Sequence, residues 1–182
     1  MESGDDPRPE KEEFPAEPAF EEVDLSHPIP DKIESRILVH PVPPEDLVSL
    51  GQTLEDRRGN EETQAELRAI RDRILEVHPE WKHIRGSYSR DTGERLKEFH
   101  VPGHGKAFGL DSRKGGHFID LTFETPSGKL IHVQSVDVDS NGKPTERELN
   151  VAERVRRSTK RVDVILIPKG AQLDKIFKRH NR

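Results

Sequence analysis

The chain has 182 residues, of which 30% are hydrophobic and 36% are charged. This length suits one domain with an additional segment, and the high charge content excludes close packing along the whole chain. The lack of cysteine excludes disulfides and thiolate metal sites, and no apolar run reaches the roughly 18 residues that a membrane span needs.

The N-terminal segment is acidic and rich in proline. Residues 2–24 carry ten acidic and two basic side chains, whereas residues 143–182 carry twelve basic and five acidic ones. We therefore expect a disordered tail or linker over 1–45, with a short strand within "DKIESRILVH", and a folded domain over 46–182. The acidic segment is either a solvating linker or a segment that covers a basic cleft or binds a partner.

The pattern of the folded part predicts an α/β (α+β) domain with a mixed central sheet flanked by helices. A helix is expected over 60–78, because apolar side chains recur at Leu67, Ile70, Ile74 and Leu75. A glycine-rich loop follows, and then two strands over 117–125 and 129–138, joined by the turn residues Pro-Ser-Gly. The last elements expected are a helix capped by Thr145, a buried strand in "RVDVILIP" and a short basic helix at the C-terminus.

Two polar residues interrupt the apolar pattern of the paired strands. Asp120 lies in the middle of the first strand, and Gln134 lies in the second. A hairpin can bring the two side chains together, and converging oxygen ligands suit Mg²⁺ or Mn²⁺, which activate water and neutralise charge on a scissile phosphate. Arg147 and Arg154 of the following helix are candidate phosphate clamps.

The order of these features resembles a known nuclease core. An aspartate in one strand, an acid or amide in the next, then a helix and a strand, is similar to the restriction-endonuclease-like PD-(D/E)xK superfamily. The segments "GSYSRDTGERLKEFHVPG" and "GGHFIDLTFETPSGKLIHVQSVDVDSNGKPTERE" resemble the C-terminal nuclease domains of polymorphic bacterial toxins. The resemblance covers about residues 70–170 and implies a metal-dependent nuclease that acts on DNA or RNA as an antibacterial effector.

The resemblance also implies roles for individual residues. Asp120 and Gln134 would be the metal-binding pair, and the lysine of the family pattern would fall on Val136. A migrated base at Lys129, Lys143 or Arg147 would then do that work, or Asp137 would be a second carboxylate, or the site would be degenerate. The candidate catalytic residues are Asp120, Gln134, Asp137, Arg147 and Glu148.

Basic residues along the chain are candidate contacts to the nucleic acid: Arg85, Arg90, Lys106, Lys114, Lys143 and Arg154. Because only 5% of the residues are aromatic, contact with the backbone rather than with bases is expected. By resemblance the protein would have a cognate immunity protein as partner. It would be made in the bacterial cytoplasm without a signal peptide and delivered to a target cell by a secretion system. Contact with a membrane is not expected, and the sequence does not give the oligomeric state.

Two other functions fit the same sequence. His100, His104 and His117 flank the glycine-rich basic loop, and a histidine pair can cleave RNA without a metal, one imidazole acting as base and the other as acid. Alternatively, the domain has kept a nuclease fold but lost catalysis, and it binds only nucleic acid or a partner.

Overall fold

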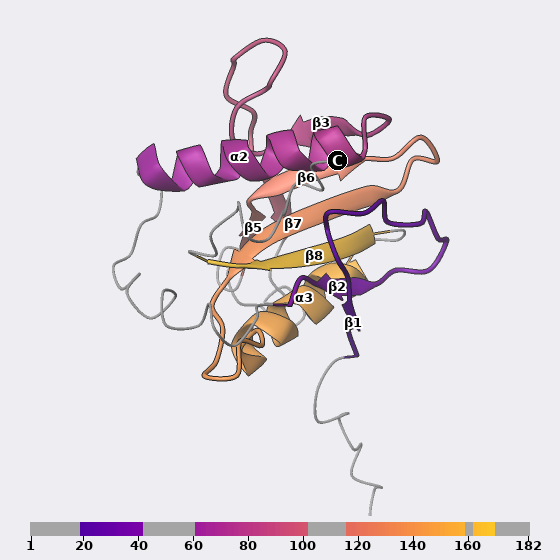
Figure 1. The fold of residues 1–182 in the computed structure, drawn as a ribbon, viewed down its shortest axis with the longest axis vertical. Coiled ribbons are helices and arrows are strands. Elements are labelled where there is room, and N and C mark those ends of the chain that lie inside the picture. Colours follow the sequence, from indigo (N-terminus) through magenta and orange to yellow (C-terminus); the bar gives the residue numbers. More distant parts are fainter. Residues whose placement is uncertain (1–18, 42–60, 102–115, 159–161, 170–182) are drawn as a thin grey trace, which may run out of the picture.

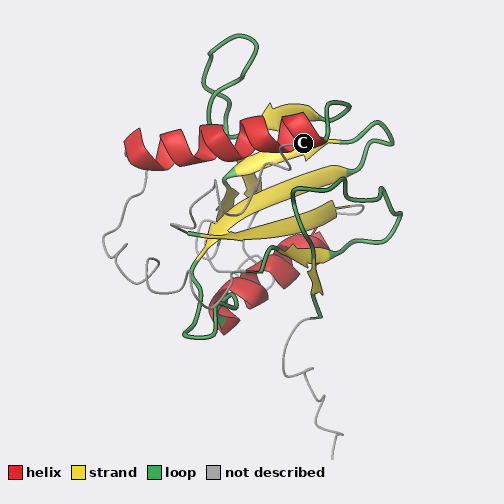
Figure 2. Cartoon of the chain, in the orientation of Figure 1, coloured by secondary structure: helices red, strands yellow, loops and turns green. Residues whose placement is uncertain are grey.

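The computed structural model describes residues 19–41, 61–101, 116–158 and 162–169 (Figure 1). Two helices and eight strands are present in these ranges (Figure 2). In chain order they are β1 (Glu21–Glu22), β2 (Ile37–Val39), α2 (Glu61–Val77), β3 (Lys82–Arg85), β4 (Phe99–Val101), β5 (His117–Ile119), β6 (Leu121–Glu124), β7 (Leu130–Val136), α3 (Glu146–Ser158) and β8 (Val162–Pro168).

A six-stranded sheet has the order β1-β2-β8-β7-β6-β3. The strands β3, β6 and β7 are antiparallel neighbours, whereas β7, β8, β2 and β1 run parallel to one another. The connection from β7 to its parallel neighbour β8 runs through α3, as a parallel pair requires. The mixed sheet predicted from the sequence is confirmed.

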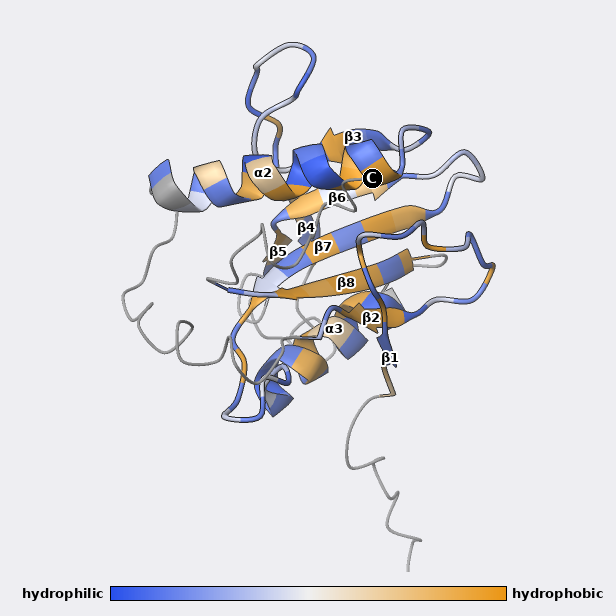
Figure 3. Cartoon of the chain, in the orientation of Figure 1, coloured by the Kyte–Doolittle hydropathy of each residue, from blue (hydrophilic) through white to orange (hydrophobic). Residues whose placement is uncertain are grey.

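The helices pack on opposite faces of this sheet (Figure 1). The buried side chains Leu67, Ile70 and Ile74 of α2 join one apolar cluster, which includes Phe123 of β6. A second cluster contains Leu149, Ala152 and Val155 of α3. All seven residues of β8 are buried between these layers, and Figure 3 shows that strand as mostly hydrophobic.

Most predicted elements agree with the structure within a few residues. The helix expected over 60–78 is α2, and the one capped by Thr145 is α3, whose Glu148 amide donates to Thr145 Oγ1 at 3.4 Å. The strand expected over 129–138 ends at Val136. The predicted C-terminal helix lies outside the described residues.

The strand expected over 117–125 is not continuous, which corrects the sequence-based assignment. It is divided into β5 and β6 by a bend at Asp120. The short β5 leaves the main sheet and pairs with β4 to form a separate two-stranded ribbon. Ile119 and Val101 of this ribbon are buried in the cluster that also contains the apolar residues of α3.

The N-terminal segment packs into the domain over residues 19–41, which differs from the disordered tail expected over 1–45, and the short strand expected within "DKIESRILVH" is β2. Strand β2 pairs with β8, β1 pairs with β2, and Leu25 is 4% exposed. The acidic composition of residues 1–45 does not indicate this packing, because β2 pairs with β8, which is far away in the sequence. Residues 1–18 and 42–45 lie outside the described ranges.

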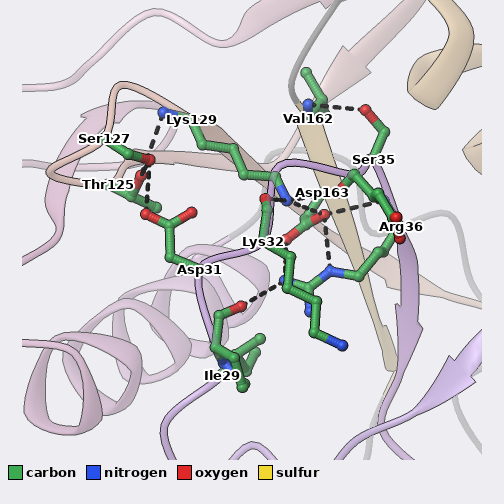
Figure 4. A network of polar contacts seen from close by, with 12 residues as sticks. Ile29, Asp31, Lys32, Ser35, Arg36, Thr125, Ser127, Lys129, Val162 and Asp163 are labelled. Carbon is green, nitrogen blue, oxygen red and sulfur yellow. Dashed lines mark hydrogen bonds and ion pairs between the residues drawn. The ribbon is translucent and has the colours of Figure 1, made fainter.

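A buried ionic network fastens this segment to the sheet (Figure 4). Asp163 of β8 is paired with Arg36 at 2.6 Å and with Lys129 at 2.7 Å. The Lys129 ammonium also donates to the carbonyl oxygens of Lys32 and Glu34. Such a network holds two segments in one register only while both cations keep their counter-charge.

No helix in the described part of the chain combines the length and the apolar character needed to cross a bilayer.

Replacing Asp163 with Asn should destabilise the domain by about 3–5 kcal/mol, because two buried cations lose their counter-charge. Urea unfolding followed by circular dichroism measures this loss. Glu153→Gln is the matched control, since it removes ion pairs to Arg156 and Arg157 at a helix surface and should cost less than about 1 kcal/mol. Equal losses in the two variants would contradict a structural role for the network.

Candidate active site

The bend at Asp120 places the apolar side chains before and after it on opposite faces of the sheet. Ile119 packs in the cluster beside α3, whereas Leu121 packs in the cluster beside α2. In a regular strand these residues, two positions apart, would point to the same face. The break therefore lets both apolar side chains be buried, and it leaves Asp120 at the junction between the sheet and the ribbon.

Gln134 of β7 bridges this junction. Its Oε1 accepts a hydrogen bond from the Asp120 amide at 3.3 Å, and its Nε2 donates to the Phe118 carbonyl at 3.2 Å. The described ladder between β6 and β7 ends at the pair Leu121 and Val133. The amide side chain thus satisfies backbone groups that the interrupted ladder leaves without partners. Asp120 and Gln134 lie together, as predicted, and the immediate role of Gln134 is to hold the bend.

The Asp120 carboxylate also contacts β7, the strand that contains Gln134. Its Oδ2 accepts a hydrogen bond from the Ser135 amide at 2.9 Å. Burial nevertheless raises the pKa of Asp120 to about 6, against the smaller opposite effect of that hydrogen bond. A half-buried carboxylate with a raised pKa is a common feature of functional sites.

Charged groups from three other parts of the chain act on this carboxylate. Glu98 and Glu148 raise the pKa of Asp120 by repulsion, whereas Lys169 lowers it. The ladder between β4 and β5 ends at the pair Phe99 and Ile119, so Glu98 and Asp120 are the residues directly beyond this end. Glu148 lies in the first turn of α3. The cluster lies where β7 and β8 end and α3 begins, an edge at which α/β proteins commonly bind ligands.

Lys169 and Asp137 complete the cluster. The Lys169 ammonium is 3.5 Å from Asp137 Oδ1, and burial together with the Asp137 charge raises the pKa of Glu148. Neither Lys169 nor Glu98 is among the residues predicted from the sequence. Lys169 had a usable signal, since it directly follows a buried strand, but Glu98 lies in a segment with no clear periodicity.

Gly86 allows the turn after β3 to lie directly against Asp120. Its φ is +80°, and a Cβ there would be 2.0 Å from the Asp120 carbonyl oxygen. No side chain fits at that distance, so the close approach of the two backbones requires glycine. The position of the Asp120 bend therefore depends on a residue 34 positions earlier in the chain.

The other candidate residues are more dispersed. Arg85, Arg90, Lys143, Arg147 and Arg154 are exposed, while Lys106, Lys114 and His104 lie outside the described residues. Lys129 is not a migrated base, because its ammonium is buried in the Asp163 network.

The two described histidines of the alternative site, His100 and His117, are not brought together. His100 pairs with Phe118, and His117 pairs with Val101. Since successive side chains of a strand alternate between faces, His100 and His117 project from opposite faces of the ribbon and do not form an acid–base pair across one cleft.

A different histidine is buried beneath the ribbon. His132 Nδ1 is 2.9 Å from Thr122 Oγ1, and its Nε2 has no partner among the described residues. The centroid of its ring is 4.7 Å from that of Phe99, and the two rings are tilted relative to each other. Burial lowers the pKa of His132 to about 4, so this imidazole is neutral at pH 7 and serves as packing for the ribbon.

Among the described residues, no three or more His, Cys, Asp or Glu side chains form a group that could hold a metal ion. The chain matches no protein-family model, and no curated protein and no solved structure is significantly similar to it.

Gly86→Ala should destabilise the protein clearly more than Gly93→Ala. Both glycines have positive φ, but a Cβ at Gly93 would have nothing within 4 Å. The control should lose about 1–3 kcal/mol from backbone strain alone, and Gly86→Ala should lose that amount plus the cost of displacing the Asp120 bend. Urea titrations measure both, and equal losses would show that the close approach is unimportant.

Asp120→Asn should stabilise the folded protein at pH 8, because it removes a charge that burial disfavours while an oxygen remains to accept from Ser135. The unfolded carboxyl ionises near pH 3.8 and the folded one near 6, so stability falls as the pH rises through this window. A pKa raised from 3.8 to about 6 corresponds to about 3 kcal/mol. We expect a gain of about 1–3 kcal/mol at pH 8 and almost none at pH 4.

Urea unfolding of wild type and variant at both pH values measures this gain. At each pH the stability of the wild type is subtracted from that of the variant, which cancels the pH-dependent contribution of His132 that both proteins share. Asp139→Asn is the control, because that exposed carboxylate accepts the amides of Asn141 and Lys143 in a turn. A variant at position 120 that is less stable than wild type at pH 8 would show that the charge supports the fold.

Proposed function

We propose that this domain is a metal-dependent nuclease with a restriction-endonuclease-like core, of the kind found at the C-termini of polymorphic bacterial toxins. The observation that carries the proposal is the position of Lys169. Its amide donates to the Val136 carbonyl at 2.8 Å, so a lysine lies beside the strand position where the family pattern has one.

The order of elements supports the proposal. The helix α2 precedes three antiparallel strands, β3, β6 and β7, and α3 then leads to β8, which is parallel to β7. Asp120 lies directly before the second of these strands, and Gln134 lies in the third. This is the strand, strand, helix and strand order on which the resemblance rests.

Lys169 provides a basic group that Val136 cannot provide. Pro168 of β8 is the register partner of Val136, and Lys169 follows it at the edge where the acidic cluster lies. An ammonium in this position would stabilise negative charge that develops on the phosphate during cleavage. In this proposal the lysine of the family pattern has moved from the position of Val136 to the residue that follows the neighbouring parallel strand.

The carboxylates supply the hard oxygen donors that the proposed reaction needs. Asp120 lies in the field of Glu98 and Glu148, and a divalent cation would relieve that repulsion. We assign the ligand roles to Asp120 and Glu148 and a positioning role to Gln134, whose amide is engaged at both ends. Mg²⁺ or Mn²⁺, which commonly keeps several waters as ligands, would supply an activated water and neutralise phosphate charge.

Arg147 completes the site at the first turn of α3, where it is exposed. The first turn of a helix also offers unpaired amide groups and a positive dipole end to a phosphate. We propose that Arg147 orients the phosphate and that Lys143 and Arg154, also exposed, contact the backbone further away.

The biological setting follows from the resemblance alone. An antibacterial nuclease requires a cognate immunity protein in the producing cell, and we propose an acidic partner that covers the basic residues of the site. Delivery to a target cell through a secretion system belongs to the same proposal.

Purified protein should cleave plasmid DNA or total RNA with Mg²⁺ or Mn²⁺ and should be inactive with EDTA. Asp120→Asn and Lys169→Ala should each lower the rate by at least about 100-fold. The control is Lys82→Ala, which removes an exposed lysine of β3 opposite Glu124, at the end of β6 away from Asp120, and should leave the rate close to that of wild type.

Three results would contradict this assignment. Cleavage that survives EDTA and Asp120→Asn would favour the histidines, and His104→Ala would then test the one that is not described. Equal rates for Lys169→Ala and wild type would remove Lys169 from the site. A folded protein with no cleavage under any condition would favour the binding module.

A further inference from the structure

Two rings stand on the outer face of the ribbon formed by β4 and β5. Phe118 is 58% exposed, His100 is also exposed, and the two are direct partners in the ladder. Their ring centroids are 4.6 Å apart with an interplanar angle of 37°. The inner face of the same ribbon carries Ile119 and Val101, which are buried. Burial of the inner face thus holds the ribbon backbone that carries the two outer rings.

The backbone beside these rings makes room for the imidazole. A Cβ on Gly116 would be 2.6 Å from His100 Nε2 and 3.4 Å from its Cε1. Any larger residue at this position would push the imidazole away. The placement of His100 across the strand therefore depends on glycine at position 116.

The rings lie next to the candidate active site along both strands. Phe118 is two residues before Asp120, and His100 is two residues after Glu98, so the Cα atoms of each pair are at most about 7 Å apart. The Phe118 carbonyl is held by Gln134 Nε2 at 3.2 Å. The same side chain therefore fixes the backbone of Phe118 and the backbone of Asp120 relative to each other.

The size of this apolar surface favours a flat group over a protein partner. Phe118 and Ile33 are the two large hydrophobic residues exposed in the described part of the chain, and Ile33 belongs to the segment before β2. A stable protein interface generally needs a contiguous surface of several hundred Å². Two adjacent rings instead present an area suited to a nucleobase, whose face stacks on aromatic side chains irrespective of sequence.

We propose that His100 and Phe118 form a stacking platform for an unpaired nucleobase one nucleotide away from the scissile phosphate. The proposal rests on the nuclease function above and names its substrate class, which is single-stranded nucleic acid or an unpaired region. In a duplex each base is already stacked between its neighbours, so the platform has no free base face to bind. It adds a base contact to the backbone contact expected from the sequence.

Binding without cleavage tests the platform directly. Fluorescence anisotropy in EDTA would compare a labelled single strand, the same strand with abasic positions, and the corresponding duplex. Phe118→Ala should weaken binding of the single strand about 5- to 100-fold, since stacking of one base on an aromatic ring has an effect of this order. Ile33→Ala, which removes the other exposed hydrophobic side chain, should bind like wild type.

Gly116→Ala is a sharper variant because it removes no group that could contact a base. It should weaken single-strand binding by displacing the His100 ring, and it should leave the weak abasic binding unchanged. Circular dichroism would check that both variants are folded.

A fluorescent variant gives a second readout that does not depend on affinity. The chain has one tryptophan, Trp81, which is buried and stacked on His78 at 3.7 Å. Phe118→Trp should therefore report stacking as a quenching of fluorescence when a single strand binds, with little change in the wild-type signal. Quenching by the single strand but not by the abasic strand is the expected result.

The outcomes separate this proposal from the nuclease proposal. Equal binding of base-containing and abasic strands, or a folded Phe118→Ala that binds like wild type, would overturn the platform even if cleavage is found. In that case the rings would be free for a protein partner. Base-dependent binding and quenching without any cleavage would support the platform and overturn the nuclease assignment.

Discussion

The break in the backbone at Asp120 is the feature on which the rest of the site depends. It lets Ile119 and Leu121 be buried on opposite faces of the sheet, and it releases β5 to form the ribbon with β4. The cost of an interrupted ladder is offset by the Gln134 amide, which binds backbone groups on both sides of the break. One bend thus creates both the position of the carboxylate and the face that carries the exposed rings.

The backbone of Asp120 is closely packed, whereas the charge of its side chain is unfavourable. Gly86 packs against the Asp120 carbonyl, while burial and neighbouring carboxylates disfavour ionisation of the side chain. A protein selected for stability alone would gain by replacing this acid with a neutral residue of similar shape. In the proposed site this charge would have a function, because cation binding at this point would offset the repulsion.

The buried network of Asp163 has a different purpose. It lies at the opposite end of β7 from Gln134, and it fastens the N-terminal segment to the sheet through Arg36 and Lys129. Because β2 pairs with β8, this segment completes the parallel half of the sheet. Lys169 directly follows β8 at the edge of that half. The support of the site therefore extends to the residues that precede and form β2, far from the site in the sequence.

The sequence by itself determined both helices, the apolar faces of β7 and β8, and the proximity of Asp120 to Gln134, because these follow from local periodicity and from pairing across a short turn. It did not reveal the break between β5 and β6, which depends on which layer each apolar side chain joins. It also missed Lys169 and Glu98, and it placed Lys129 among the candidate bases. Those assignments were decided only by the tertiary structure, since the β4–β5 and β7–β8 pairings join residues far apart in sequence, and no local pattern encodes such a pairing.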